Sequence, residues 1–303
     1  MSRSAILVIG SANMDLVVST PRFPQPGETV FGSKFGMHPG GKGANQAVAA
    51  AKLGGDVHFL GKMGNDLFRD KLCAGMQKDG VQLEHLLIDP DESTGMALIT
   101  VEGSGQNEIV VVSGSNMNLS PTDIAGKRAV FSGAKIVLLQ LEIPLDTVIQ
   151  AARLAKEHGA LVILNPAPAR ELPQQLLSLV DYLTPNETEA GLLTGQAVHD
   201  QASAQAAAKK LLATSVKNVI VTMGEKGALL VNQGKTELFP PKKVQAVDTT
   251  AAGDAFNGAL AFSLASDKNL EEAIRFANSV AAYSVTKMGA QSSMPTMEEL
   301  KRM

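Results

Sequence analysis

The sequence predicts an α/β protein with a mostly parallel central sheet, helices on both faces and a small additional β-sheet. Six short runs rich in Val, Ile and Leu alternate with longer helical patterns, as is typical of parallel sheets. Two segments break this alternation and have the pattern of strand–turn–strand units, which predicts the second sheet. The 303 residues suit one large α/β domain or two small ones, and we expect 1–303 to form a single domain.

The apolar runs are expected to be buried strands, and the patterns between many of them predict helices. The strands are AILVIG (5–10), VHFLG (57–61), KIVLLQL (135–141), ALVILN (160–165), NVIVTMG (218–224) and ALLVNQ (228–233). Helices are predicted at NQAVAAAKLG (45–54), DTVIQAARLAKEHG (146–159) and AQAAAKKLLATS (204–215), and from Ala252 onward in TTAAGDAFNGALAFSLA (249–265). Ligands of such sheets bind beyond the carboxyl ends of the strands, where most of the motifs below fall.

The additional sheet is expected from approximately 13–38 and 95–114. The first segment contains DLVVST and TVFGSKFGMH around the Pro-rich bend PRFPQPGE, and the second contains GMALITVE and NEIVVVSG around GSGQ. Neither unit is expected to be followed by its own helix. They form either a lid over a ligand or two edge hairpins without function. The polar residues Asn13 and Asp15, where the first segment leaves the core, favour the lid.

Composition limits the classes of function. Hydrophobic residues make up 45% and charged residues 19%, as in globular proteins, and the net charge of −3 argues against a nucleic-acid or membrane-surface partner. The single Cys73 excludes an internal disulfide and favours a reducing compartment. No stretch approaches the ~20 apolar residues of a membrane span, so a cytoplasmic location is expected. The histidines show no metal-ligand spacing, and no zinc site is expected: His38, His58, His85, His158 and His199.

The usual phosphate-binding loops are absent from the sequence. G-x-x-x-x-G-K-[ST] does not occur, and the nearest approach to G-x-G-x-x-G, Gly41-Lys42-Gly43, lacks the third glycine. DTTAAGDAF (248–256) offers another anion site, because a buried helix would begin near Ala251-Ala252-Gly253 with free backbone N–H groups. Asp254 in its first turn is either a base that takes a proton from a hydroxyl or a helix-capping residue.

Three further segments each allow two interpretations. PGGKGANQ brings Lys42 and Asn45 to the start of a helix, as a ligand site or only a tight turn. Asn186 and Glu189, one helical turn apart, would hold Mg²⁺ through waters or cap the helix. TMGEKGALL (222–230) is either a plain hairpin or a contact for nucleotide phosphates.

Together these segments resemble the ribokinase family of carbohydrate kinases. The motifs that carry the resemblance span nearly the whole chain in order: GSANMD, PGGKGANQA, NPAPA, TPNETE, VTMGEKG, DTTAAGDAFNGAL and KMGAQSSMP. Each motif is weak by itself, but their order and spacing are specific. One departure is Ala251, where many members have the glycine of GAGD. Since alanine still offers its N–H, little effect on the anion site is expected.

The resemblance implies an α/β sandwich with a β-sheet lid over the sugar, and commonly homodimers formed through the lid. It implies ATP-dependent phosphorylation of D-ribose at O5, with Asp254 as the base. The backbone at Ala252 and Gly253 would form the anion hole for the transferring phosphoryl group.

The resemblance also implies the binding residues. The sugar positions are Asn13, Asp15, Gly41, Lys42, Gly43, Asn45 and Glu142. The ATP positions are Asn186, Glu189, Thr222, Gly224, Lys226, Gly227, Gly253 and Asn278. A monovalent cation, usually K⁺, is implied at Asp248, Thr250, Ser284, Lys287, Gly289 and Ser293, several of which would contribute only carbonyl groups. Mg²⁺ is expected with ATP.

Two alternatives stay open at this point. One is a sugar kinase of the same fold that acts on 2-deoxyribose or fructose, since selectivity between hydroxyls cannot be read from sequence. The other is a sugar-binding sensor without catalysis, which the intact Asp254 and its small-residue turn argue against.

Overall fold

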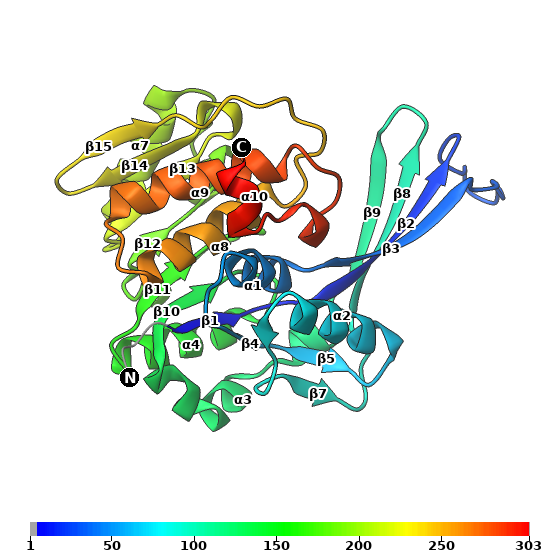
Figure 1. Ribbon diagram of the computed structural model, residues 1–303, viewed down its shortest axis with the longest axis horizontal. Helices are drawn as coiled ribbons and strands as arrows, with labels where there is room; N and C mark the ends of the chain where they lie inside the picture. Colours follow the sequence, from blue (N-terminus) through cyan, green and yellow to red (C-terminus); the bar gives the residue numbers. More distant parts are fainter. Residues whose placement is uncertain (1–4, 303) are drawn as a thin grey trace.

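A nine-stranded sheet forms the centre of the protein in the computed structural model, which describes residues 5–302 (Figure 1). Its strands lie in the order β15 (Thr236–Phe239), β14 (Ala228–Asn232), β13 (Asn218–Thr222), β12 (Tyr182–Leu183), β11 (Leu161–Leu164), β10 (Ala134–Leu139), β1 (Ala5–Ile9), β4 (Val57–Leu60) and β6 (Val81–Gln82). Within this sheet only the pairs β13–β14 and β14–β15 are antiparallel, so the predicted, mostly parallel sheet is confirmed.

Strand β1 shows how the sheet separates two cores. Successive side chains of a strand point to opposite faces. Ile6 and Val8 therefore belong to one buried cluster, and Leu7 and Ile9 belong to the other. Each such side chain contributes roughly 1.5–3 kcal/mol when it is fully buried. The continuous apolar runs of the sequence follow from burial on both faces.

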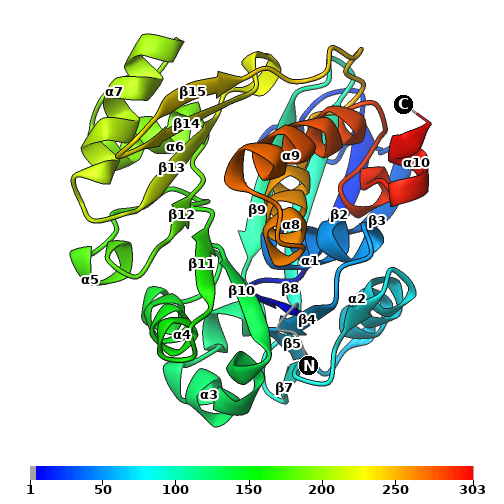
Figure 2. The same ribbon diagram turned by 60° about the vertical axis from the view of Figure 1, so that its left-hand side comes forward.

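Helices cover both faces of this sheet (Figure 2). The face of Ile6 and Val8 is covered by α1 (Lys42–Lys52), α2 (Leu67–Lys78), α8 (Ala252–Ala265) and α9 (Leu270–Ser284), with α10 (Met297–Lys301) at its edge. The face of Leu7 and Ile9 is covered by α3 (Pro121–Gly126), α4 (Leu145–Glu157), α5 (Gln174–Leu177), α6 (Glu187–Thr194) and α7 (Gln201–Leu212). Within the described residues, no helix combines the length and the apolar character that a membrane crossing requires.

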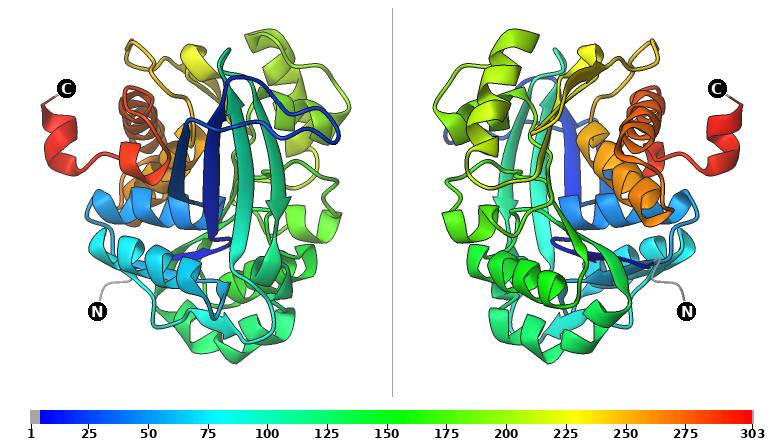
Figure 3. Two further views of the ribbon diagram at one scale, coloured as in Figure 1. Left: turned by 90° about the vertical axis from the view of Figure 1, so that its right-hand side faces the viewer. Right: turned by 90° about the vertical axis from the view of Figure 1, so that its left-hand side faces the viewer.

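The additional sheet projects from this body as four long strands side by side (Figure 3). Their order is β3 (Lys34–Gly40), β2 (Asn13–Thr20), β8 (Gly95–Glu102) and β9 (Asn107–Val112). Two details differ from the prediction. Strand β3 begins at Lys34 rather than Thr29, because the last contacts with β2 are those of Ser33 and Lys34 with Ser19. In addition, β3 runs directly into α1 through Gly41, so this hairpin is followed by a helix.

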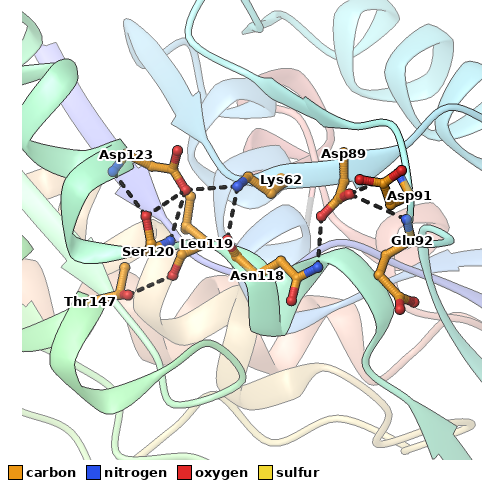
Figure 4. Close-up of polar contacts among 9 residues, drawn as sticks. All are labelled: Lys62, Asp89, Asp91, Glu92, Asn118, Leu119, Ser120, Asp123 and Thr147. Carbon is orange, nitrogen blue, oxygen red and sulfur yellow. Dashed lines mark hydrogen bonds and ion pairs between the residues drawn. The ribbon is translucent and has the colours of Figure 1, made fainter.

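A polar network fixes the point where the projecting sheet rejoins the body (Figure 4). Lys62 of β5 (Lys62–Gly64) donates to Asp123 Oδ2 at 2.7 Å and to the carbonyl of Asn118 at 2.8 Å. The Asn118 side chain donates to Asp89 Oδ2 on β7 (Leu87–Asp89) at 2.8 Å. Asn118 ends the short helix η1 (Gly114–Asn118) that follows β9. The root of the projecting sheet is therefore held to the neighbouring strand pair and to α3.

Candidate active site

Helices α1 and α8 lie side by side above the sheet, and their contact brings distant sequence motifs together (Figure 1). Gly258 of α8 permits the contact, since a Cβ there would lie 2.6 Å from both the Cβ of Ala49 and the carbonyl of Gln46. Gly43, in the first turn of α1, sits against β1, and a Cβ there would lie 2.7 Å from the backbone of Gly10 and Ser11. Gly43 therefore places the start of α1 at the carboxyl end of β1, and Gly258 lets α8 pack closely against α1.

Asp254 stands in the first turn of α8 and is buried. Its Oδ2 accepts a hydrogen bond from Asn45 Nδ2 at 2.9 Å, and its Oδ1 accepts one from Gln46 Nε2 at 2.9 Å. The N-cap position of α8 is Ala251, which makes no side-chain capping bond. The carboxylate thus bonds to α1, and the helix-capping interpretation of Asp254 is wrong.

A buried amide network extends from Asp254 into the protein. Gln46 also donates to Asn165 Oδ1 at 3.1 Å, and Gln140 donates to Gln46 Oε1 at 2.7 Å. Gln291 donates to Asn45 Oδ1 at 3.2 Å. Sequence reasoning missed Gln46, Asn165, Gln140 and Gln291. Gln46 alone had a signal, because a second polar residue beside Asn45 in an Ala-rich helix has no packing reason.

Lys42 is surrounded by three carboxylates whose charges act on it, those of Asp254, Glu142 and Glu189. Burial, the largest cause, raises the pKa of Asp254 overall, although Lys42, Asn45 and Gln46 act in the opposite direction. Burial lowers the pKa of Lys42, but the carboxylates of Asp254, Glu142 and Glu189 outweigh burial and raise it. Lys42 therefore stays charged and favours the ionised form of Asp254, which can then accept a proton.

A second polar group lies at the base of the projecting sheet. Glu142 Oε2 accepts from Ser11 Oγ at 2.5 Å and from the backbone N–H of Lys42 at 3.0 Å. Asn13 Oδ1 accepts from Asn116 Nδ2 at 2.7 Å, and Asn116 also bonds to the backbone of Ala12. The structure therefore holds Asn13 and Glu142 in place, whereas Ser11 and Asn116 were not predicted from sequence.

Asp15 lies next to this group on β2. Burial, and then the charge of Glu142, raise the pKa of Asp15 to about 6. Gly40 is required beside it, since a Cβ there would lie 2.5 Å from Asp15 Oδ2. Two carboxylates on a partly buried surface are costly without a ligand, and sugar hydroxyls would supply the missing hydrogen-bond donors.

Asp15→Asn is expected to stabilise the ligand-free protein at pH 8. The pKa of Asp15 is about 6 in the folded protein and 3.8 ordinarily, so between pH 3.8 and about pH 6 the folded state binds more protons than the unfolded state. The free energy of unfolding therefore falls as the pH rises through this range. The gain from the substitution is therefore full above pH 6 and absent below about pH 4. Melting temperatures of both proteins at pH 8 and pH 5 test this. An equal shift at the two pH values would contradict it.

A cleft of about 970 Å³ opens at the start of α8, where Ala252 and Gly253 line it. Of the predicted ATP residues, it is lined by Asn186, Thr222, Gly224, Lys226, Gly227, Gly253 and Asn278, together with Ala252 of the predicted anion hole. Glu189 is not among the lining residues, and its carboxylate accepts the N–H of Asn186 in a reciprocal capping box. The cleft has the size of a nucleotide-binding pocket.

Several of these residues also shape the cleft. Gly227 has φ 98°, and a Cβ there would lie 2.1 Å from the carbonyl oxygen of Phe239, so only glycine fits. Asn278 donates to the same carbonyl at 2.7 Å. The segment 222–230 forms a hairpin, since β13 and β14 pair antiparallel, and the turn between them lines the cleft. Its contact with nucleotide phosphates stays a prediction. Val244, Ala281 and Val285 add an apolar wall that sequence reasoning missed.

The turn before α8 differs from the expectation in two respects. Ala251 adopts φ 59°, the left-handed conformation that costs a non-glycine residue roughly 1–2 kcal/mol. Alanine at this position, where many members of the family have glycine, therefore strains the turn. Moreover, the N–H of Ala252 is not free, because it donates to the carbonyl of Thr249 at 3.3 Å. A hydrogen bond of this length is weak, so an anion could replace the Thr249 carbonyl as the acceptor. The next residue, Gly253, is exposed and lines the cleft.

Three residues of the predicted cation site, Asp248, Thr250 and Gly289, are joined by hydrogen bonds. Asp248 accepts from Thr250 N at 2.9 Å through Oδ1 and from Gly289 N at 2.8 Å through Oδ2. Burial acts to raise the pKa of Asp248, but hydrogen bonding by the Thr250 side chain and by the N–H groups of Gly289 and Thr250 together lowers it. Ser284 and Ser293 donate their hydroxyl groups to the carbonyls of Ala281 and Ala290.

Lys287 points away from this group. Its ammonium pairs with Glu299 at 2.7 Å and lies over the Tyr283 ring. The donors that remain are a carboxylate, carbonyls and hydroxyls, which are hard oxygen ligands that suit an alkali cation.

A buried acid in the first turn of a helix whose start lines a nucleotide-sized cleft supplies two parts that phosphoryl transfer to a hydroxyl needs, a proton acceptor and an anion site. Comparison with known proteins agrees: residues 3–297 match the family described as pfkB family carbohydrate kinase. The chain belongs to this family.

Three relatives illustrate the similarity. A Haemophilus influenzae protein named ribokinase is 45% identical over 297 residues, which are 98% of this chain and 97% of that protein. A Salmonella typhi protein named deoxyribokinase is 42% identical over 295 residues, which are 97% of this chain and 96% of that protein. The solved structure of Arabidopsis thaliana ribokinase complexed with ribose and ATP has a TM-score of 0.92 at 35% identity and covers 100% of this chain and 98% of its own.

Proposed function

We propose that the protein transfers the γ-phosphoryl group of ATP to O5 of D-ribose and releases D-ribose 5-phosphate and ADP. The observation that carries this proposal is the position of Asp254. Its buried carboxylate is bonded to Asn45 and Gln46 on one side, while Ala252 and Gly253, directly before it, line the nucleotide cleft. The relatives named ribokinase support ribose as the acceptor.

The reaction needs three contributions from the chain. Asp254 accepts the proton of the O5 hydroxyl as this oxygen forms its bond to the γ-phosphorus and the bond to the β–γ bridging oxygen of ADP breaks. The backbone of Ala252 and Gly253, at the positive end of the α8 dipole, stabilises the charge on the transferring group. Asn13, Asp15 and Glu142 position the sugar through its hydroxyls.

Mg²⁺ bound to ATP would neutralise charge on the phosphates. Asn186 and Glu189 fit this ion, since they present an amide oxygen and a carboxylate at the start of α6 and can act through its water ligands. K⁺ would be held by Asp248 and by backbone carbonyls of 284–293. Both Asp248 oxygens already accept one N–H, and each keeps a lone pair for a cation.

An assay of ADP release with a panel of sugars tests the proposed function. Ribose is expected to give the highest kcat/KM, above 2-deoxyribose and fructose. 2-Deoxyribose is the main alternative acceptor, because one relative at 42% identity is named deoxyribokinase. A preference for 2-deoxyribose or fructose would replace the proposed acceptor, and no sugar-dependent ADP release with Mg²⁺ and K⁺ present would favour a sugar sensor.

Replacing K⁺ by Na⁺ at constant ionic strength is expected to lower kcat several-fold. The physical reason is that the loop 248–250 leads directly into the anion hole, so a cation of the wrong size disturbs Ala252 and Gly253. The rate of ADP release in the two salts measures the effect. Asp248→Asn should remove most of the difference between the salts, and an unchanged rate in Na⁺ would contradict the site.

A homodimer through the lid is part of the proposal. All six residues of β9 are exposed, including Ile109 and Val111 at 53% and 57%. Since β9 is an edge strand, this apolar surface invites pairing unless something covers it. A second lid of the same chain would cover it.

The double substitution Ile109→Lys/Val111→Lys is expected to convert the dimer to a monomer, because two charges cannot be buried unpaired in an apolar interface. Sedimentation velocity measures the change. Leu192→Lys on α6, whose side chain is also well exposed, should leave the dimer intact. A wild-type protein that sediments as a monomer at micromolar concentration would contradict the proposed assembly.

A further inference from the structure

Three potential metal ligands converge at the edge of the main sheet, on β4 and on the turn that follows β6. In the described part of the chain, His58, Glu84 and His85 form a group whose ligand atoms all lie within 4.8 Å of one another. His58 Nδ1 lies 2.6 Å from Glu84 Oε1, and His85 Nε2 lies 3.4 Å from the same oxygen. Sequence spacing gave no sign of this group, because the pairing of β4 with β6 brings the two histidines together.

The other ring nitrogen of His58 also has a partner. His58 Nε2 lies 3.5 Å from Asp56 Oδ1, and the side-chain amide of Gln82 donates to that same carboxylate oxygen. A carboxylate on the far nitrogen of a histidine fixes the tautomer and orients the ring toward a metal. In the metal-free protein Nδ1 donates to Glu84 Oε1 at 2.6 Å, so metal binding must release this proton and leave the ring proton on Nε2, which faces Asp56.

We propose that His58 Nδ1, His85 Nε2 and a Glu84 oxygen bind one first-row divalent transition metal ion, with Zn²⁺ as the best-suited ion. Two imidazoles and one carboxylate are a recurrent ligand set for zinc. In a tetrahedral zinc site with bonds of ~2.0 Å, ligand atoms lie roughly 3.3 Å apart, which requires only side-chain rotations from the observed arrangement. The fourth position is left to water.

Charge and exposure both suit such an ion. Glu84 and Asp56 bring two negative charges, and Lys127 is the cation whose field reaches His85 and opposes binding. The side chains of His58 and His85 are 20% and 26% exposed, so they are held by their surroundings but open to solvent. The kinase residues lie at the carboxyl ends of the strands, whereas His58 pairs with Gln82 within the β4–β6 edge.

The bound ion would tie the turn after β6 to β4. Strand β6 has only two residues and ends the sheet, and the turn after it is closed by the Leu86 N–H donating to the Leu83 carbonyl at 3.0 Å. A metal that binds the folded but not the unfolded chain stabilises the fold by mass action.

Titration of the tag-free, chelator-treated protein with Co²⁺ tests the proposal, with excess Mg²⁺ present to fill oxygen-ligand sites. We expect one equivalent of Co²⁺ with visible ligand-field absorption, its displacement by Zn²⁺, and a higher melting temperature with Zn²⁺. His58→Ala and His85→Ala should each abolish the absorption. Asp56→Asn should weaken binding about 10- to 100-fold, as loss of an orienting carboxylate does.

His199→Ala is the matched control, since the His199 side chain is 74% exposed and pairs only distantly with Asp200. It should bind Co²⁺ like the wild type. Unchanged Co²⁺ binding in His58→Ala and His85→Ala, in proteins with wild-type circular dichroism, would overturn the site. So would the absence of saturable binding in the wild type, which would leave the group as an ion pair only.

Discussion

Replacing Asp254 by asparagine is expected to lower kcat by about 10²- to 10⁴-fold, the range in which a positioned proton acceptor contributes to a reaction. The carboxylate is the buried acid at the start of α8, and Lys42 favours its ionised form. The proposed sugar contacts through Asn13, Asp15 and Glu142 would remain. We therefore expect ribose affinity to change much less than kcat.

The hydrogen bonds of Asp254 make asparagine an imperfect replacement. Both carboxylate oxygens accept from amide NH₂ groups, those of Asn45 and Gln46. An asparagine at 254 would turn its own NH₂ group toward one of these donors, so one hydrogen bond is lost. Asp254→Ala should accordingly be measured beside it. If kcat falls in both Asp254→Asn and Asp254→Ala, the missing base is the cause. If kcat falls only in Asp254→Asn, the disturbed hydrogen bonds of Asn45 and Gln46 are the cause.

Turnover is measured by ADP release and ribose affinity by calorimetry with a non-hydrolysable ATP analogue. Asp267→Asn is the control, since the Asp267 side chain is 89% exposed and pairs only with Lys135. It should keep the wild-type kcat. A kcat within a few-fold of wild type in Asp254→Asn would remove Asp254 from the reaction and leave its buried charge without a purpose.

The parts of the fold that were predictable from sequence share one physical property. Strands buried on both faces carry continuous apolar runs, so β1, β4, β10, β11, β13 and β14 could all be recognised. Strands β6 and β12 have only two residues each, which is too short for a pattern, and their place is set by their neighbours. Helix α9, with fifteen residues, was missed although Asn269 and Glu272 form its capping box.

The residues of the candidate site also fall into a group that was predictable from sequence and a group that was not. Residues that act close to their own motif, such as Asp254 at the start of α8 or Gly227 in its turn, could be placed from sequence because local geometry determines their position. Partners from distant segments could not. Gln291 reaches Asn45 across 246 positions, and Gln140 reaches Gln46 across 94, so only the packed sheet and helices bring them together.

Gly43→Ala is expected to destabilise the fold by about 1–3 kcal/mol, the usual cost of overpacking, and to lower kcat/KM by up to about 100-fold. A Cβ at this position would lie 2.7 Å from Gly10 C and from Ser11 N, which are backbone atoms of the β1 exit. Since a backbone cannot move aside as a side chain can, the start of α1 must shift. Lys42 and Asn45 shift with it, and Asp254 then loses the hydrogen bond from Asn45.

Gly75→Ala separates this steric effect from the general effect of alanine on a helix. Gly75 lies inside α2, and a Cβ there would meet nothing within 4 Å. Its replacement should stabilise the protein by about 0.5–1 kcal/mol, because alanine loses less conformational entropy than glycine. Urea denaturation and the ADP assay measure both variants. If Gly43→Ala were as stable and as active as Gly75→Ala, the close approach of α1 to β1 would not be what places Lys42 and Asn45 beside Asp254.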